Sequence, residues 1–135
     1  MRIRPEIETR IAASHLIWLT TVTPGSVPQT SLVWFWWDGE SILIYSQPQM
    51  PKLANIERNP RVSLNLDAMA TGKEEVTIVT GIAAIDEPAP PVSEHAEYRE
   101  KYRRLIEDEL GMTVEQFSKT YSVPIRVIPD SVRAW

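Results

Sequence analysis

The sequence predicts a mainly β fold of the α+β class, a small antiparallel barrel with helical insertions. Three observations lead to this prediction. β-Branched and aromatic residues form about six short alternating segments, the pattern of strands in a sheet. Pro24-Gly25 marks a turn and Asp38-Gly39 a hairpin between consecutive segments of this kind. About three or four short segments with helical spacing lie among the strands.

The N-terminal part is expected to begin with a helix and to continue as a meander of strands. Residues 4–15 place Pro5 in a first helical turn and carry Ile7 and Ile11 four residues apart. That spacing gives a short amphipathic helix. The strands of the meander are expected at residues 16–23, 27–37 and 41–47.

The second of these strands ends in the aromatic run "WFWW" at 34–37. Because successive side chains of a strand point to opposite faces, Leu32, Trp34 and Trp36 share one face. Val33, Phe35 and Trp37 share the opposite face. Both faces are apolar, so both must pack against other parts of the protein. We interpret the run as core plus subunit interface. An added role in binding a planar cofactor ring stays open.

The chain continues with one short helix and further strands. The helix begins at Pro51 and stops at Asn59-Pro60, because a residue before proline avoids the helical region. A turn is expected at Gly72, and Gly81 marks an expected bulge in its strand. The remaining strands are expected at residues 61–68, 75–87 and 121–135.

Two helices are expected between the last two strands. The first follows a Pro-rich linker at 88–91, is capped at Ser93 and ends at Gly111. The second starts with a capping-box pattern, Thr113 followed by Gln116. These helices complete the set of helical insertions in the predicted barrel.

Composition excludes several classes of protein. A chain of 135 residues is the size of one domain, so residues 1–135 are expected to form a single unit. With no cysteine and only His15 and His95, far apart, neither a disulfide nor a zinc site is expected. A net charge of −4 argues against a nucleic-acid or anionic-membrane surface. The chain lacks a long apolar run and a signal-peptide pattern, so we expect a cytoplasmic protein without membrane contact.

A candidate anion site lies at the start of the short helix that begins at Pro51. Lys52 stands in its first turn, where the positive end of the helix dipole disfavours a cation unless an anion binds there. Ser46 lies just before, at the end of a strand. The alternative is that Lys52 simply extends into solvent. Other cations that could serve an anionic ligand, or be ordinary surface residues, are Arg58, Arg61 and Arg126.

Several stretches together resemble a known family. They are "VPQTSLVWFWWDGESILIYSQPQMPKLANIERNPRVSLNL" (27–66), "VTGIAAI" (79–85) and the terminal "PIRVIPDSVRAW". They resemble the flavin-reductase-like split β-barrels related to pyridoxamine 5′-phosphate oxidase. The similarity is greatest to the branch that uses the deazaflavin coenzyme F420 rather than FMN. The resemblance implies a six-stranded split barrel that forms a homodimer, with a cofactor in each cleft between the subunits.

The resemblance also implies which residues hold the cofactor. Lys52, preceded by Ser46 and Gln47, is similar to the family's lysine that binds the cofactor phosphate at a helix start. The residues implied along the edge of the tricyclic ring are Gln29, Thr30, Ser31, Leu32 and Val33. The C-terminal strand would approach the ring across the interface, which makes Trp135 and Arg133 candidates for a pocket wall.

The sequence departs from the FMN-using oxidases of this family. Thr30 stands where those enzymes carry an arginine for the phosphate, and Met50-Pro51 replaces their Ser-Arg. Their Arg-x-His near the C-terminus is missing from "SVRAW". Pyridoxamine-phosphate oxidation and a tightly bound FMN are therefore not expected.

The leading hypothesis is an oxidoreductase that uses reduced coenzyme F420 to transfer hydride to an unsaturated or conjugated small organic substrate. The catalytic residues are unknown, and the proton would come from solvent or from a hydroxyl such as Ser31 or Tyr45. An FMN-dependent oxidoreductase of the same family is the alternative. A non-catalytic protein that binds a flavin, deazaflavin or tetrapyrrole, and a purely structural dimer, also stay open.

Overall fold

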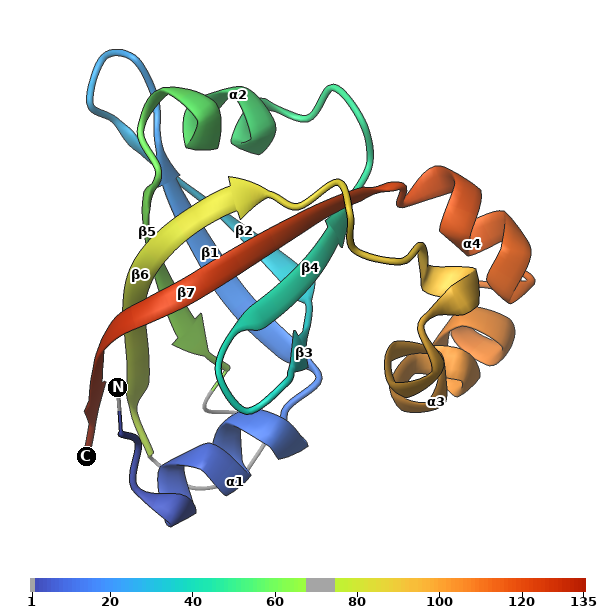
Figure 1. Cartoon of the computed structure of the whole chain (residues 1–135), viewed down its shortest axis with the longest axis horizontal. Coiled ribbons are helices and arrows are strands. Elements are labelled where there is room, and N and C mark those ends of the chain that lie inside the picture. The colour runs from blue at the N-terminus through green and yellow to red at the C-terminus, as the bar shows by residue number, and fades with distance from the viewer. Residues whose placement is uncertain (1, 68–74) are drawn as a thin grey trace.

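Figure 1 shows the computed structural model of the chain, which describes residues 2–67 and 75–135. The helices are α1 (Pro5–Ala13), α2 (Pro51–Arg58), α3 (Ala96–Arg104) and α4 (Val114–Thr120), with a 3₁₀ turn at Val92–Glu94 and a π-helical turn at Leu105–Glu109. The strands are β1 (Leu16–Val22), β2 (Pro28–Trp34), β3 (Trp36–Trp37), β4 (Ile42–Ser46), β5 (Arg61–Leu66), β6 (Thr77–Ile85) and β7 (Val123–Ala134). The turn expected at Gly72 lies outside the described residues.

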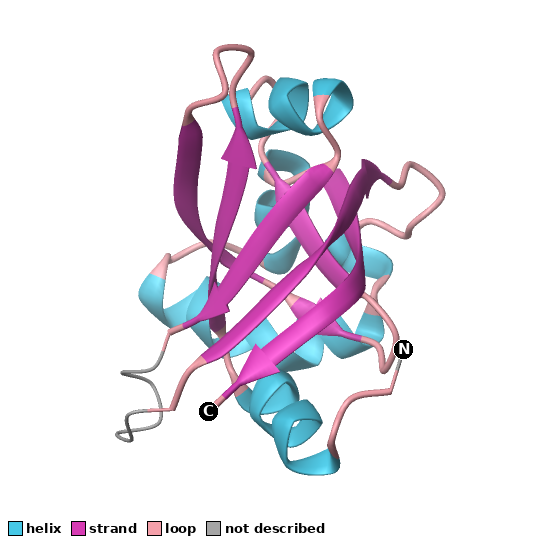
Figure 2. Cartoon of the chain, turned by 90° about the vertical axis from the view of Figure 1, so that its left-hand side faces the viewer, coloured by secondary structure: helices cyan, strands magenta, loops and turns pink. Residues whose placement is uncertain are grey.

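The strands form one antiparallel sheet that curls into a split barrel, as predicted. In the described residues it has seven strands in the order β2-β1-β5-β6-β7-β4-β3. The two ends of this order, β2 and β3, are joined directly in the chain, so the sheet bends round on itself (Figure 2). Helices α3 and α4 lie together beside the barrel, and α2 lies near one end of it (Figure 1). No helix in the described part is long and apolar enough to cross a membrane.

The sheet has one strand more than the six predicted because the strand expected at 27–37 is interrupted at Phe35. The Phe35 N–H donates to the Tyr102 hydroxyl at 2.8 Å. The Phe35 carbonyl accepts from Lys101 Nζ at 2.8 Å, and the Tyr102 oxygen lies 2.7 Å away. Two side chains of α3 thus hydrogen bond the Phe35 N–H and carbonyl, which a neighbouring strand would otherwise pair. The chain leaves β1 at this point and pairs with β4.

Side chains pack into two separate cores, and the aromatic run contributes to both. The barrel core is mainly aliphatic, with Leu64 and Ile44 fully buried, and includes Phe35 and Trp37. The second cluster, the helical core, lies between the sheet and α3 and α4. It holds the buried residues Leu43, Tyr45, Val92, Tyr98, Tyr102, Ile106, Val114 and Phe117, with Trp34 and Trp36 packed against them.

The alternation predicted for the aromatic run is confirmed, since its two faces enter different cores. The covering of the second face differs from the prediction. Trp34 and Trp36 pack against the chain's own helical core, whereas contact with a partner subunit was predicted for this face. Leu32, on the same face, stays 41% exposed.

A bulge lies opposite Gly81, the glycine at which an irregularity was predicted. Thr80 pairs with Ser131 while Gly81 pairs with Pro129, so Asp130 is an extra residue on β7. A Cβ at Gly81 would lie 2.4 Å from the Ile128 carbonyl oxygen, which is too close for any other residue without movement of the backbone. The bulge therefore requires glycine at this position.

One predicted helix start is wrong and the other is confirmed. Helix α3 is capped by His95, whose Nδ1 accepts the Tyr98 N–H at 3.0 Å, and not by Ser93. Ser93 lies in the preceding 3₁₀ turn, where its N–H donates to Ser118 Oγ. Helix α4 has the predicted capping box, in which Thr113 and Gln116 exchange hydrogen bonds.

Candidate functional site

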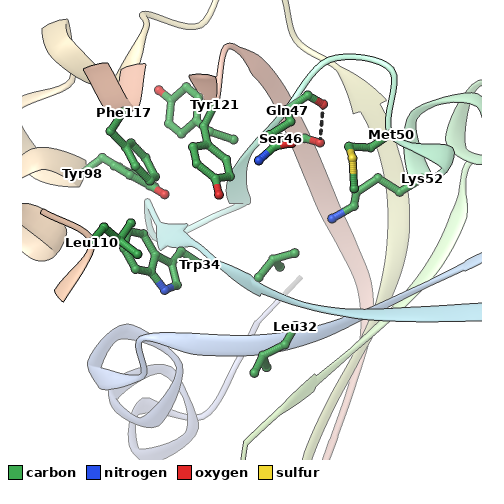
Figure 3. A pocket seen from close by; sticks show the side chains of 12 residues that line it. Leu32, Trp34, Ser46, Gln47, Met50, Lys52, Tyr98, Leu110, Phe117 and Tyr121 are labelled. Atoms are coloured by element: carbon green, nitrogen blue, oxygen red, sulfur yellow. Dashed lines mark hydrogen bonds between the residues drawn. The ribbon is translucent and has the colours of Figure 1, made fainter. Parts of the chain in front are cut away.

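A cavity of about 340 Å³ lies where β2, the end of β4 and the start of α2 meet the helical core. Figure 3 shows that Lys52, Met50 and the Ser46-Gln47 segment lie at one end and that aromatic side chains gather at the other. Its lining residues are Leu32, Val33, Trp34, Tyr45, Ser46, Gln47, Met50, Lys52, Tyr98, Leu110, Phe117 and Tyr121. The volume falls in the range of small-molecule sites.

The polar end is built by the turn from β4 into α2. β4 stops at Ser46, whose hydroxyl donates to the Gln47 carbonyl at 2.8 Å, and Gln49 takes a left-handed φ of 64°. α2 then starts at Pro51 without a side-chain cap and without an acidic residue in its first turn. In the first turn Pro51 has no N–H and the Leu53 N–H donates to the Met50 carbonyl at 3.0 Å, which leaves the Lys52 N–H and the positive end of the helix dipole for an anion.

Lys52 is the cation at this helix start. It is half-buried, and burial lowers the pKa of its ammonium from the ordinary value. A bound anion would offset both this desolvation and the unfavourable helix dipole. The arrangement at this end suits a phosphate group.

The other end of the cavity is an aromatic wall. Trp34 stacks on Tyr102 with ring centroids 4.6 Å apart and on Phe117 at 5.3 Å. Phe117 stacks in turn on Tyr121 at 4.4 Å. These stacked rings form an apolar side of the cavity, against which a planar ligand could pack.

Tyr45 lines the cavity but its hydroxyl is already engaged. It donates to the Pro90 carbonyl at 2.5 Å, and burial raises its pKa to about 12. The hydroxyl therefore stays protonated at neutral pH and directs its proton away from the cavity. Ser31, the other hydroxyl considered from the sequence, does not line the cavity; it lies on β2 opposite Leu19.

Comparison with known proteins identifies the family. The pyridoxamine 5′-phosphate oxidase family profile matches residues 3–135. The chain belongs to this family. Comparison with curated proteins gave no match.

Solved structures confirm the fold of this family member. An F420 reductase superposes with a TM-score of 0.74 at 21% identity, over 97% of this chain and 98% of that one. A pyridoxamine 5′-phosphate oxidase-like protein from Listeria innocua gives 0.66 at 21%, over 96% and 94%. The heme storage protein HutZ from Vibrio cholerae gives 0.65 at 18%, over 100% and 94%. At these identities the similarity shows a shared fold and no particular ligand.

The cavity of this pyridoxamine 5′-phosphate oxidase family member brings together about half of the residues expected from the sequence. Those that line it are Lys52, Ser46, Gln47, Leu32 and Val33. The side chain of Gln29 instead accepts from Asn55 Nδ2 at 2.9 Å, and Thr30 hydrogen bonds Thr20 at 2.8 Å.

Trp135 lies elsewhere in the described monomer. This residue is 65% exposed, and its backbone exchanges hydrogen bonds with Val76. Arg133 lies over this ring, 5.6 Å from its centroid. Two of the other candidate cations have acidic partners: Arg61 pairs with Asp130, and Arg126 pairs with Asp38 and Asp86.

Sequence reasoning missed the contribution of the C-terminal helices to the cavity of this family member. Tyr98 comes from α3, Phe117 from α4, and Leu110 and Tyr121 from the segments that follow each helix. The helical stripe that contains Tyr98 was visible in the sequence, but nothing local showed that it faces β2. No group of three or more potential metal ligands gathers in the parts of the chain described here.

Proposed function

We propose that this protein is an oxidoreductase that binds reduced coenzyme F420 in the cavity and delivers its hydride to a small conjugated organic substrate. The observation that carries the proposal is the pairing, in one cavity, of an uncapped helix start bearing Lys52 with a wall of stacked aromatic rings. A cofactor with a phosphate and a planar ring matches both ends. The cofactor supplies the redox chemistry, and the protein binds, orients and shields it.

In this proposal the polar end holds the phosphate. Lys52 Nζ, the Lys52 backbone N–H at the start of α2, and the Ser46-Gln47 segment would act as donors. Asn55, which is 4% exposed, keeps α2 in place because its Nδ2 donates to Thr21 and Gln29. Gln29 thus acts through the position of the helix rather than by touching the phosphate.

The ring would lie along β2. This strand stands at the end of the sheet order and pairs with β1 on one side only, so backbone groups over 29–33 can hydrogen bond the ring edge. Leu32 and Val33, whose side chains point to opposite faces of β2, both line the cavity there and would give the ring apolar contacts. Since Tyr45 and Ser31 do not present a proton to the cavity, we propose solvent as the proton source.

The proposal includes a homodimer with the cofactor between subunits. Large apolar side chains remain exposed on the outer surface of the described barrel, among them Trp18 and Leu32 at 41% each and Ile128 at 53%. Trp18 and Leu32 are cross-strand partners, so these two side chains form a continuous apolar patch next to the cavity. In such a dimer the partner's Trp135 and the partner's Arg133 would form the remaining wall of the pocket.

Titration of the cofactor-free protein with coenzyme F420 and, separately, with FMN tests the proposal. We expect tight binding of F420 and much weaker binding of FMN. Lys52→Ala should weaken F420 binding by about 1.5 to 3 kcal/mol, the contribution of a charged hydrogen bond. Arg58→Ala is the matched control, because Arg58 is exposed at the other end of α2.

The outcomes separate the alternatives. Preference for FMN would make the protein an FMN-dependent member of the family. Binding without substrate-dependent oxidation of the reduced cofactor would indicate a storage or carrier protein, and binding of neither cofactor would overturn the proposal. Equal losses in Lys52→Ala and Arg58→Ala would remove Lys52 from the site.

A further inference from the structure

A second cavity, of about 630 Å³, lies on another side of Trp34. Trp34 is the residue that it shares with the first cavity. The remaining apolar lining comes from Leu16, at the start of β1, and Leu105, just after α3. The second cavity therefore has an apolar side able to cover the body of an organic molecule.

The charged lining of this cavity is mostly basic. Lys101, Arg103 and Arg104 contribute three cations against the single carboxylate of Glu100. This excess of positive charge contrasts with the net charge of −4 of the whole chain. Positive charge concentrated in one cavity of an acidic protein attracts anions to that place.

These cations differ in how they are held. The Arg104 side chain makes no hydrogen bond or ion pair with any residue of 2–67 or 75–135, and Arg103 pairs with Glu107 only at 3.8 Å. Lys101 is fixed: its Nζ donates to the Phe35 carbonyl at 2.8 Å and lies 4.1 Å from the centre of the Phe35 ring. Burial lowers the pKa of Lys101 to about 8, so it is mainly protonated at pH 7.

His15 adds a neutral polar group to the same cavity. Burial, and then the nearby charge of Lys101, lower the pKa of its imidazole from the ordinary value. At neutral pH the ring is mostly uncharged, so it can donate or accept a hydrogen bond without adding charge.

We infer that this second cavity binds a small organic anion, with an acidic group held by Arg103, Arg104 and Lys101 and an aromatic body packed against Trp34 and Leu105. This site is separate from the proposed cofactor site and does not depend on the cofactor's identity. Because Trp34 borders both cavities, the bound anion would lie next to the proposed cofactor site.

Calorimetric titration with 2-naphthoate and its neutral analogue 2-naphthamide tests this inference. We expect 2-naphthoate to bind about tenfold more tightly than the amide, since a charged hydrogen bond is lost in the amide. The double variant R103Q/R104Q should weaken 2-naphthoate binding by about tenfold and leave 2-naphthamide binding unchanged. Both arginines are exposed, so the variant is expected to fold, which circular dichroism would verify.

Two controls locate the site. R58Q removes one exposed cation elsewhere and should leave 2-naphthoate binding unchanged. K52A should also leave it unchanged, whereas a loss in K52A would place the anion in the first cavity and overturn the inference. Failure of 2-naphthoate to bind, equal binding of acid and amide, or unchanged binding in R103Q/R104Q would overturn it as well. Failure of F420 binding alone would overturn only the proposed function.

Discussion

The barrel core and the helical core are filled by different kinds of side chain. The barrel core consists mostly of isoleucine, leucine and valine from strands; Trp37, whose Nε1 donates to Glu8 Oε1 at 3.1 Å, adds a polar side-chain group at its edge. Half of the buried residues in the helical core are aromatic, and two of them carry hydroxyls that hydrogen bond to the backbone. Tyr102 bonds to Phe35 and Tyr45 to Pro90.

The two cores contribute differently to the stability of the fold and to the binding site. The barrel core lies inside the sheet and touches the first cavity mainly through Val33. The helical core provides the aromatic wall of that cavity through Trp34, Tyr98, Phe117 and Tyr121. Changes in the first core should therefore alter stability, and changes in the second should alter both stability and binding.

The largest effect should come from a cavity in the barrel core. Leu64 is fully buried there, so Leu64→Ala should lower the free energy of unfolding by about 2 to 5 kcal/mol. Denaturant unfolding would measure the loss, and cofactor affinity should stay unchanged under folding conditions. A change in affinity as large as that of Lys52→Ala would show that the two cores are not separable in this way.

A smaller loss is expected from removing one hydroxyl of the helical core. Tyr102→Phe leaves the buried Phe35 N–H without its acceptor, so the free energy of unfolding should fall by about 1 to 3 kcal/mol. Tyr121→Phe is the matched control, because the Tyr121 hydroxyl makes no hydrogen bond within the described residues. Equal effects of the two variants would contradict the assigned role of Tyr102.

The smallest effect should be a pH dependence at the edge of the helical core. The folded chain releases the Lys101 proton at a pKa of about 8, while the unfolded chain keeps it up to the ordinary value of 10.5. Between about pH 8 and pH 10.5 the unfolded state binds more protons than the folded state, so the free energy of unfolding rises with pH over this range because of Lys101. Below about pH 8 both states hold the proton, and Lys101 adds no pH dependence.

Unfolding of the wild type and of Lys101→Met at pH 7, 8 and 9.5 would measure this contribution. The difference in unfolding free energy between them should move in favour of the wild type as pH rises. Raised pKa values of the buried tyrosines act at higher pH and are common to both proteins, so they cancel. A difference that stays constant over this range would contradict the lowered pKa.

The strands could be predicted from the sequence because alternation is a local pattern. The interruption at Phe35 could not, because Tyr102, which takes its N–H, is 67 residues away. The cap of α3 was misplaced for a related reason. Ser93 is a good capping residue by type, but its N–H bonds to Ser118 on α4, and His95 is left to cap the helix.

The candidate site divides in the same way. Ser46 and Gln47 lie at the end of β4 and Lys52 at the start of α2, within seven residues of one another. Sequence and family resemblance together therefore predict that they lie in one place, and all three line the cavity. Phe117 and Tyr121 reach the cavity through packing of α4 against Trp34, which no local pattern reveals. The cofactor roles of all the residues expected from the sequence stay predictions, both for those that line the cavity and for Gln29, Thr30, Ser31 and Trp135.

The bulge on β7 has a consequence for comparing this chain with its relatives. Before Asp130, odd-numbered residues such as Val127 enter the barrel core; after it, even-numbered ones such as Val132 do. An alignment gap of a single position between these two valines would assign every side chain of the C-terminal segment to the wrong face of the sheet. To decide whether a relative has a side chain at the position of Trp135, the number of residues between Val127 and Val132 should therefore be compared first. The identity of those residues is less informative.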